Sequence, residues 1–423
     1  MTSERECFVY IMLPGATEFV TAGRFRWIDD GEAPVGQFVY GRSYLERPDA
    51  VEFDPIELQL SSEVRQKARL QGFFGAIRDA MPDFWGRRVI ERRFGVAELA
   101  EFDYLLRSPD DRAGALAFGA NVQPPLPRRQ FSRTLDLASL QSTADAIVAG
   151  KEPDTTPTAR HVEELLLLGT SMGGARPKAV VQEGDTLWLA KFASPEDRWN
   201  HPKVEHGMLN LARACGLQVA DSRVDTVADR DVLLVRRFDR ERRGKALSRH
   251  RMISALTLLQ SGDAVGERDR WSYLLLADEV RRASAAPQDD LRELFARMCF
   301  NAATSNIDDH PRNHAMLAPG TSWRLSPAYD LVPSPVLALD RRDLAMACGQ
   351  YGRQANRTNL LSGHGRFLLE EAEASAIFDQ ITETVRRRWR NVMQGAGVTE
   401  ADRETIGRAF LYDGLSYTVA PKP

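Results

Sequence analysis

The stretch SNIDDHPRNHAML, from Ser305 to Leu317, decides how this chain is interpreted. It places Asp308, Asp309, His310 and Asn313 together, just after the run LFARMCFNAA. Three interpretations compete for these residues: a polar turn that caps a helix, a metal site, and the catalytic loop of a phosphotransferase.

The spacing favours the phosphotransferase. Asp308 precedes Asn313 by five residues, as the catalytic aspartate precedes the magnesium-binding asparagine in the kinase pattern HRDxxxxN. A short loop can present the aspartate to a substrate hydroxyl and the asparagine to the metal on the phosphates. A zinc site is disfavoured, because no second His or Cys cluster lies nearby at ligand spacing. For the DDH residues alone, a polar turn is an equally good interpretation.

Three further stretches carry residues that phosphoryl transfer needs. Asp330, in RLSPAYDLVPS, is a candidate for the second magnesium ligand, or else a turn aspartate ahead of Pro333. Lys191, in LWLAKFAS, shares a strand face with Leu189, and a lysine among apolar neighbours requires an anionic partner. Glu205, on the following amphipathic helix, is that candidate partner; the alternative is a solvated lysine on an edge strand.

A glycine pair precedes this strand in GTSMGGARPK. Gly173 and Gly174 allow a ligand to approach the backbone closely. Arg176 and Lys178 add positive charge, which would suit a phosphate held by backbone amides. The segment matches neither GxxxxGK[ST] nor GxGxxG, so an ordinary glycine turn is the alternative. In order, the chain offers a glycine loop, a strand lysine, a helix glutamate, Asp-x4-Asn and a further aspartate, which are the parts of a two-lobed kinase.

Composition sets the remaining bounds. The 423 residues suit two or three domains, and an apolar fraction of 43% predicts a substantial core. A net charge of −3 gives no general attraction to nucleic acid or membrane. The four scattered cysteines form no CxxC pair, and MTSERECFVYIML lacks the basic start of a signal peptide. No stretch approaches the length of a membrane span, and we expect a cytoplasmic protein without a membrane partner.

The pattern of elements predicts an α+β, two-lobed, kinase-like fold, with a mixed α/β N-terminal lobe and a mostly helical C-terminal lobe. Hairpins are expected around Glu183–Asp185 and Ala228–Arg230, with a helix between them that ends at Gly216. RQKARLQGFFGAIRDAMPDFWGRRVIERRFG reads as helical with an interruption at Pro82, and RMISALTLLQ begins a series of helices. The expected domains are 1–122, 131–245 with the glycine loop, and 246–423 with the catalytic loop.

The segments SMGGARPKA, LAKF, LLVRRFDR, NIDDHPRNHA and LSPAYDL resemble those of the HipA-type serine/threonine kinases, which are toxins of bacterial toxin–antitoxin pairs. FFGAIRDAMPDFWGRRVIE resembles the amino-terminal region of that family, so the resemblance covers nearly the whole chain. It implies ATP and Mg²⁺ as cofactors, Asp308 as catalytic base, and Asn313 and Asp330 as magnesium ligands. It also implies Ser171 as an autophosphorylated serine and Glu205 as the partner of Lys191. The nucleotide-binding set implied by the resemblance is Gly173, Gly174, Ala175, Arg176, Pro177, Lys178, Lys191, Arg236, Arg237, Phe238, His310, Asn313, Tyr329 and Asp330.

Two positions depart from the family pattern. Arg236 stands where the family often has an acidic residue, and Asp309 where it usually has a small one. The resemblance implies three kinds of partner: a HipB-like helix-turn-helix antitoxin, operator DNA reached through that antitoxin, and a protein substrate such as an aminoacyl-tRNA synthetase. A small-molecule phosphotransferase, and a kinase-like scaffold without turnover, remain alternative functions.

Overall fold

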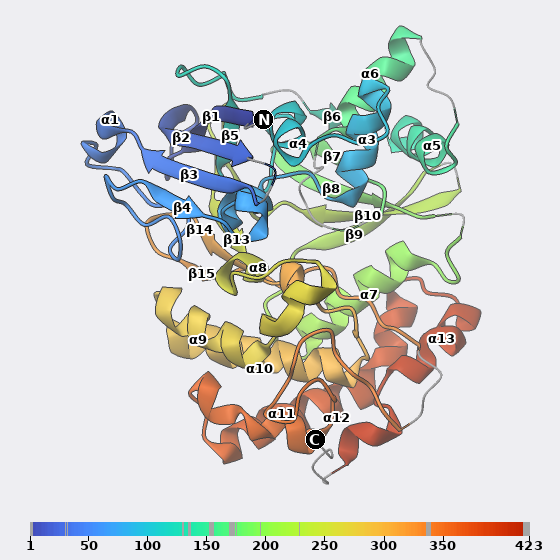
Figure 1. The fold of residues 1–423 in the computed structure, drawn as a ribbon. Coiled ribbons are helices and arrows are strands. Elements are labelled where there is room, and N and C mark those ends of the chain that lie inside the picture. Colours follow the sequence, from blue (N-terminus) through green and yellow to red (C-terminus); the bar gives the residue numbers. More distant parts are fainter. Residues whose placement is uncertain are drawn as a thin grey trace.

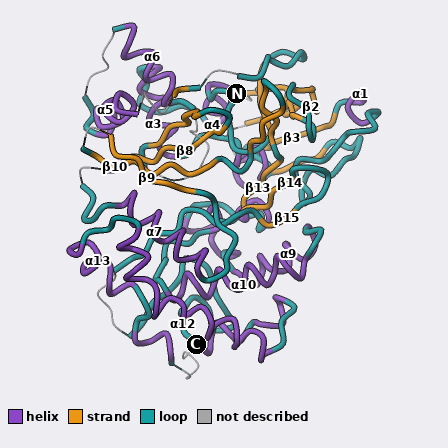
Figure 2. Tube along the Cα trace, turned by 180° about the vertical axis from the view of Figure 1, so that it is seen from behind, coloured by secondary structure: helices purple, strands orange, loops and turns teal. Residues whose placement is uncertain are grey.

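Two five-stranded sheets form the upper part of the molecule, and helices form the lower part (Figures 1 and 2). The computed structural model describes residues 3–29, 31, 33–128, 131–133, 137–151, 156–168, 174, 176–194, 196–227, 229–335 and 340–417. This arrangement confirms the expected α+β fold with a sheet-rich lobe followed by a helical lobe. Within the described residues, no helix is both long and apolar enough to cross a membrane.

The first sheet has the strand order β4-β3-β2-β1-β5, and all its paired neighbours are antiparallel. Its apolar face buries Phe25, Phe38 and Tyr40 against Phe73 and Phe74. Aromatic pairs of this kind supply much of the core of a small sheet. The strands are β1 (Ser3–Met12), β2 (Phe19–Asp29), β3 (Val35–Tyr40), β4 (Arg65–Lys67) and β5 (Leu116–Gly119).

The second sheet has the order β6-β7-β8-β10-β9. Gly184 adopts a φ of +55° in the turn between β7 and β8, and Asp229 adopts +63° between β9 and β10, so both predicted hairpins are confirmed. The helix between them ends at Ala214, with Cys215 as its C-cap, and Gly216 follows at φ +91°, close to the expected end. The elements are β6 (Ser132–Arg133), β7 (Lys178–Glu183), β8 (Thr186–Phe192), α7 (His201–Ala214), β9 (Ser222–Val227) and β10 (Arg230–Arg236).

The helical lobe is built on α10 (Pro287–Ala303), which packs against α9 (Tyr273–Ala283) and α12 (Glu371–Gly395). Pro287 starts α10, and a capping box between Glu370 and Glu373 starts α12. A 3₁₀ turn, η3 (Val265–Arg270), precedes α9, and another, η4 (Pro311–Asn313), follows the two aspartates of the opening stretch. The smaller helices of this lobe are α8 (Ala255–Leu258), α11 (Arg357–Ser362) and α13 (Glu400–Ile406).

Two predicted helical stretches are wrong in part. Arg251–Ser254 forms strand β13, which pairs with β14 (Ala315–Ala318), and β14 pairs in turn with β15 (Arg324–Leu325). Pairing with a partner more than 60 residues away overrides the local helical pattern. Similarly, Arg65–Lys67 is a strand and not the start of a helix. The helices beyond it are α2 (Gly75–Asp79) and α3 (Phe84–Phe94), on either side of Pro82 as expected.

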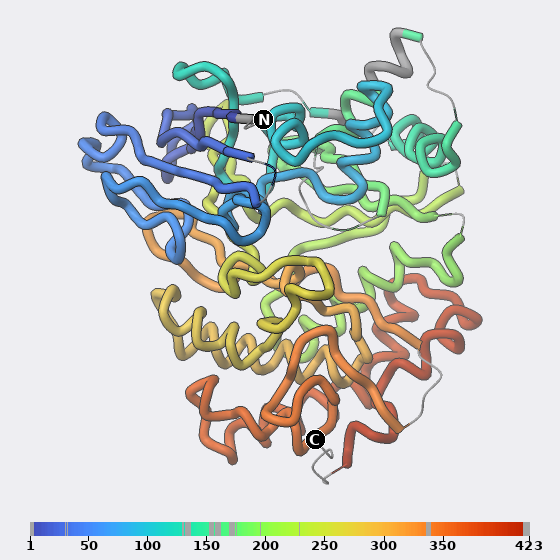
Figure 3. Tube along the Cα trace, viewed as in Figure 1, coloured from blue at the N-terminus to red at the C-terminus, as the bar shows by residue number. Residues whose placement is uncertain are grey.

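The N-terminal sheet and its helices lie beside the second sheet, as the blue and cyan chain next to the green chain in Figure 3 shows. α3 and α4 (Glu101–Arg107) continue toward the second sheet, where α5 (Leu137–Val148) and α6 (Pro157–Leu166) pack against α3. α1 (Arg42–Leu45) lies at the far side, and the hairpin of β11 (Arg240–Arg243) and β12 (Ala246–Arg249) follows the second sheet. Lys191 and Glu205 of the sheet-rich lobe meet Asp330 of the helical lobe, so these three predicted site residues lie where the two lobes join.

Candidate active site

Lys191 joins three elements at the junction of the lobes. Its ammonium donates to Glu205 on α7 at 2.6 Å and to Asp330 in the helical lobe at 2.8 Å. The partnership of Lys191 and Glu205 expected from the sequence is therefore present in the structure. Lys191 lies on the same face of β8 as Leu189 and is paired with Leu233 of β10. Because its ammonium reaches Asp330, this face of the sheet is the one that meets the helical lobe.

The three charges do not share the same protonation behaviour. Burial lowers the pKa of Lys191, but the two carboxylates outweigh this and hold it above its ordinary value. Burial raises the pKa of Asp330, and the stronger effect of Lys191 leaves that pKa below its usual range. For Glu205 burial dominates over Lys191, and the pKa is raised. The lysine is thus charged, and Asp330 is the carboxylate held ionised beside it.

Asp330 is fixed in an unusual backbone conformation. Its φ is +58°, in the left-handed region that non-glycine residues seldom adopt. The preceding Tyr329 donates its hydroxyl to the carbonyl of Arg312 at 2.7 Å, so this loop is tied directly to the stretch that holds Asn313. A strained residue held by its surroundings is frequent at functional sites.

The two adjacent aspartates have different environments. Asp309 is buried, and its carboxylate accepts hydrogen bonds from Tyr273 and from His314, the latter at 2.9 Å. Asp308 is exposed and faces a cavity. Burial raises the pKa of Asp308, and the charges of Asp330 and Asp309 raise it further against the opposing effect of His310. Of the two, Asp308 is the carboxylate that a substrate can reach, and its raised pKa suits a proton acceptor.

Asn313 ends the short turn that follows. Its amide nitrogen donates to the carbonyl of Asp308 at 3.4 Å, so its side-chain oxygen is the atom left to face a cation. The described residues contain no cluster of three or more His, Cys, Asp or Glu side chains that could hold a metal by itself. Asn313 and Asp330 could therefore supply only part of a coordination sphere, which suits Mg²⁺ because it keeps waters and takes phosphate oxygens.

The strand end Arg236–Phe238 presents backbone atoms beside a small apolar cluster. Arg236 and Arg237 donate their amides to Asp221 and Leu187 at 2.8 and 2.9 Å. The amide of Phe238 makes no hydrogen bond within the part of the chain that the structure describes. Beside it lies a small apolar cluster, separate from the main core, made by Ala220, Val224, Leu233, Val235, Phe238 and Tyr329. An aromatic base would fit against this cluster while it bonded to the strand end.

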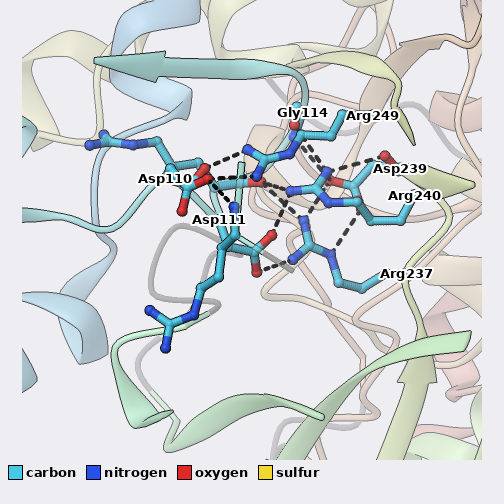
Figure 4. A network of polar contacts seen from close by, with 9 residues as sticks. Asp110, Asp111, Gly114, Arg237, Asp239, Arg240 and Arg249 are labelled. Carbon is cyan, nitrogen blue, oxygen red and sulfur yellow. Dashed lines mark hydrogen bonds and ion pairs between the residues drawn. The ribbon is translucent and has the colours of Figure 1, made fainter. Parts of the chain in front are cut away.

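The Arg237 side chain belongs to a buried polar network (Figure 4). It donates to Asp111 at 2.7 Å and to Asp239 at 3.0 and 2.9 Å. Arg240 donates to the same two carboxylates, at 2.8 and 2.7 Å. All four side chains are at most 4% exposed. Asp111 belongs to the N-terminal region, so this network fastens that region to the strand end.

The glycine segment lies only partly within the described residues. Ser171, Gly173 and Ala175 fall outside them, and their predicted roles stay predictions. Gly174 adopts a φ of +95°, and its carbonyl accepts from the Lys178 ammonium at 2.9 Å. Lys178 also donates to Asp83 at 2.7 Å. Burial raises the pKa of Asp83, and Lys178 counteracts only part of that effect.

The neighbouring residues of this segment are held elsewhere. Arg176 forms a two-point ion pair with Asp197, at 3.0 and 2.7 Å. The Pro177 carbonyl accepts from the amide of Phe192 at 3.0 Å. Both Arg176 and Lys178 therefore have protein partners in this structure.

Two cavities border the stretch from Ile307 to Arg312. The larger, about 600 Å³, lies between the N-terminal region, Gly174 and the helical lobe, and Arg78, Asp83 and Arg312 line it. The smaller, about 390 Å³, contains Asp308 and His310. The Nδ1 atom of His310 is buried and has no hydrogen-bond partner among the described residues.

Sequence reasoning missed residues that position the site from a distance. Asp79 accepts from Ser254 twice and from Thr257 once, each at 2.7 Å, and lies 3.7 Å from the Arg312 guanidinium. Arg312 is itself paired with Asp263 at 2.7 Å. No local pattern marks these partners, because they come from separate parts of the chain. Of these carboxylates, Asp83 could have been found from the sequence, as the N-cap of a helix that begins after Pro82. Its side chain accepts a hydrogen bond from the amide of Gly86 at 2.8 Å at the start of α3.

Two family models and two named relatives match this chain. The family model described as HipA-like C-terminal domain matches residues 170–389, and that of the HipA N-terminal domain matches residues 17–119. A protein of Sinorhizobium fredii named "Putative kinase Y4mE" is 26% identical over 328 residues, which cover 73% of this chain and 74% of the relative. A "Putative kinase" of Haemophilus influenzae is 23% identical over 183 residues, which are 39% of this chain and 52% of that protein.

A solved structure shares the fold across both lobes. It is the toxin–antitoxin complex of HipA, HipB and operator DNA from Shewanella oneidensis MR-1, in which a chain matches with a TM-score of 0.67. The match covers 95% of this chain and 94% of that one at 15% identity, so it supports the fold alone. The C-terminal family model, by contrast, spans more than half of the 423 residues. The chain therefore belongs to the HipA family.

Proposed function

We propose that the protein is an ATP-dependent serine/threonine protein kinase that acts as a HipA-like toxin. The observation that carries the proposal is Lys191, held between Glu205 at 2.6 Å and Asp330 at 2.8 Å, with Asp330 near enough to the exposed Asp308 for its charge to raise the pKa of Asp308. A strand lysine paired with a helix glutamate is the device that orients ATP phosphates in kinases. The alternative of a solvated lysine on an edge strand is wrong, because β8 is the central strand of its sheet.

The nucleotide would lie between the second sheet and the helical lobe. Its adenine would rest on the apolar cluster with Phe238 and Tyr329 and bond to the Arg236–Phe238 backbone. This role uses main-chain atoms, so Arg236 in place of an acidic side chain does not disturb it. The phosphates would extend toward Lys191 and the glycine segment, where Gly174 allows close approach.

Mg²⁺ would be held by the side-chain oxygen of Asn313 and the carboxylate of Asp330. Asp330 is ionised beside Lys191, and the Asn313 amide nitrogen is already engaged, so both present oxygen atoms. When bound, the ion would neutralise charge that develops on the phosphate oxygens.

Asp308 would then accept the proton of a serine or threonine hydroxyl. That hydroxyl oxygen forms a bond to the γ-phosphorus while the bond to the β-phosphate oxygen breaks and ADP leaves. The neighbouring charges of Asp330 and Asp309 raise the affinity of Asp308 for a proton. Asp309 would not take part directly, since Tyr273 and His314 occupy its carboxylate.

The family resemblance extends the proposal to regulation and partners. Ser171 would be autophosphorylated, and its added charge of nearly −2 would repel the nucleotide from the glycine segment. A HipB-like antitoxin would bind the kinase and carry it to operator DNA, as the HipA–HipB–DNA complex of the structural relative suggests. The substrate would be a cytoplasmic protein, with an aminoacyl-tRNA synthetase as the first candidate.

Transfer of labelled γ-phosphate by the purified protein tests the function. We expect Asp308→Asn to remove most transfer while ATP binding is kept, because the change removes a base and no phosphate contact. Asp413→Asn, at an exposed carboxylate outside both cavities, is the matched control and should retain transfer. Label only on small molecules would favour the small-molecule phosphotransferase, and no ATP turnover at all would favour the scaffold. Full activity in Asp308→Asn would refute the assignment of the base.

A further inference from the structure

The cavity that contains Asp308 has a wall on each side that carries an arginine. One wall is η3 and the residues after it, with Arg268 and Trp271. The other is the stretch from Leu344 to Arg353. It turns back on itself, and the backbone N–H of Cys348 donates a hydrogen bond to the carbonyl of Gly352. Between them the cavity measures about 390 Å³, and Ile307, Ala345 and Ala347 give it an apolar lining. Asp308 lines this cavity, so a hydroxyl that occupies it can meet the carboxylate.

The two walls are fixed to each other. The amide of Ala347 donates to the carbonyl of Trp271 at 2.8 Å, and the amide of Tyr273 donates to Ala347 at 2.9 Å. The shape of the cavity is therefore set by backbone hydrogen bonds and not by side-chain packing alone. A preformed site loses little conformational entropy when it binds a segment.

In both arginines the Nε atom is hydrogen-bonded to a backbone carbonyl, and the terminal nitrogens of the guanidinium are not bonded in the part of the chain that the structure describes. The Arg268 guanidinium lies 4.6 Å from the centroid of the Trp271 ring, and its Nε donates to the Asp263 carbonyl at 2.9 Å. The Nε of Arg353 donates to the Leu344 carbonyl at 2.6 Å. Within the described residues, neither guanidinium has a carboxylate at ion-pair distance, although most arginines of this chain do. Their terminal nitrogens remain for a ligand.

The charges of the cavity define the ligand. Asp269, on the rim, is exposed and makes no ion pair with either arginine within 4.0 Å. Asp308 has to stay open to the acceptor hydroxyl. With these two carboxylates against Arg268 and Arg353, the cavity is not strongly cationic, so it would favour a segment with one acidic residue over a polyacidic one.

We propose that this cavity is the acceptor site for the substrate protein, and that Arg268 and Arg353 select a serine or threonine with an aspartate or glutamate close to it. The proposal rests on the function proposed above and adds the class of substrate. The carboxylate would receive charge-assisted hydrogen bonds from the free guanidinium ends while the hydroxyl faces Asp308. Trp271 and the two alanines would pack against the intervening side chains of the segment.

Peptides with a single serine test this. In a set of matched peptides, each flanking position carries Asp, Asn or Lys in turn, and kcat/KM is measured for each. We expect wild type to favour Asp over Lys at one or two positions by roughly tenfold, since a charge-assisted hydrogen bond contributes that order of selectivity. Arg268→Gln and Arg353→Gln should each reduce the ratio, and Arg353→Glu should shift the preference toward Lys.

The controls separate this proposal from the kinase itself. Arg281→Gln, at an exposed arginine on α9 outside the cavity, should keep the wild-type ratio. Thermal melting and ATP affinity identify any variant that is misfolded. Equal loss for all peptides in the arginine variants would overturn the proposal and indicate a contact with the transferred phosphate. Transfer to the chain's own serines without any peptide selectivity would also overturn it, whereas absence of all ATP turnover would refute the kinase function as well.

Discussion

The buried network at the strand end gives a prediction with a definite magnitude. Asp111 is fully buried, and its carboxylate accepts hydrogen bonds from Arg237 at 2.7 Å and from Arg240 at 2.8 Å. Asp111→Asn removes its charge and leaves Asp239 to compensate two buried guanidinium groups. Breaking a buried ion pair from one side costs about 3–5 kcal/mol, because the remaining charge is left without a partner.

The cost translates into a measurable shift. An unfolding entropy of about 2.1 cal/mol/K per residue gives roughly 0.9 kcal/mol/K for the whole chain, so the midpoint of thermal unfolding should fall by about 3–6 °C if the chain unfolds as one unit. ATP affinity should fall too, because Arg237 directly precedes Phe238. Denaturant titration and calorimetry measure the first effect, and nucleotide titration measures the second.

A surface pair provides the control. Arg5 and Asp103 lie 2.8 Å apart, but their side chains are 38% and 34% exposed. Solvent screens such a pair, and Asp103→Asn should cost at most about 1 kcal/mol. If Asp111→Asn costs no more than Asp103→Asn, the network is not a coupled buried unit and the reasoning is refuted.

Acid gives an independent check on the same residue. Burial raises the pKa of Asp111, but Arg237 and Arg240 outweigh it and hold the pKa below its ordinary value. A carboxylate whose pKa is lowered by folding stabilises the protein above the unfolded pKa of about 3.9, and this contribution is lost as the pH falls through the folded pKa. The stability difference between wild type and Asp111→Asn should therefore be constant near neutral pH and narrow below about pH 4.

Three other predictions concern the site. Asp330→Ala should weaken nucleotide binding with Mg²⁺ present and have little effect in EDTA; equal effects in isothermal titrations under both conditions would contradict the metal role. Because burial and nearby carboxylates raise the pKa of Asp308, kcat should rise with pH through a midpoint above the ordinary aspartate value of about 3.9, and a rate that is flat to pH 4 would exclude it as the base. Incubation with ATP and Mg²⁺ followed by phosphopeptide mapping should find phosphate on Ser171; a phosphorylated form that binds ATP as well as the unmodified one would contradict the regulatory role.

The parts of the site that the sequence predicted depend on short spacings. Lys191 and Glu205 are fourteen residues apart on a strand and the next helix, and both lie on faces that alternation and helical periodicity identify. The relation of Asp308 to Asn313 is likewise contained in one loop. Such patterns can be predicted because the periodicity of each strand or helix fixes the face on which a side chain lies.

What the sequence could not predict depends on distant partners. The five-residue spacing to Asn313 favours Asp308 over Asp309, but it does not predict that Asp309 is buried against Tyr273, 36 residues away. Lys178 has a cationic side chain suited to phosphate, but its partner Asp83 lies 95 residues earlier. Strand β13 was missed for the same reason, since β14 pairs with it from beyond α10.

These distant partners share an origin that bears on how the kinase is built. Asp79 holds the start of the helical lobe near Arg312, Asp83 holds Lys178, and Asp111 holds the strand end through Arg237 and Arg240. All three carboxylates come from the N-terminal region. Without that region, Lys178 would lose its buried partner Asp83, and Arg237 and Arg240 would keep only Asp239 between them. A buried charge left without a partner costs several kcal/mol. Under the proposed function, the N-terminal region thus forms part of the wall of the active site, since Arg78 and Asp83 line the larger cavity together with Gly174 and Arg312.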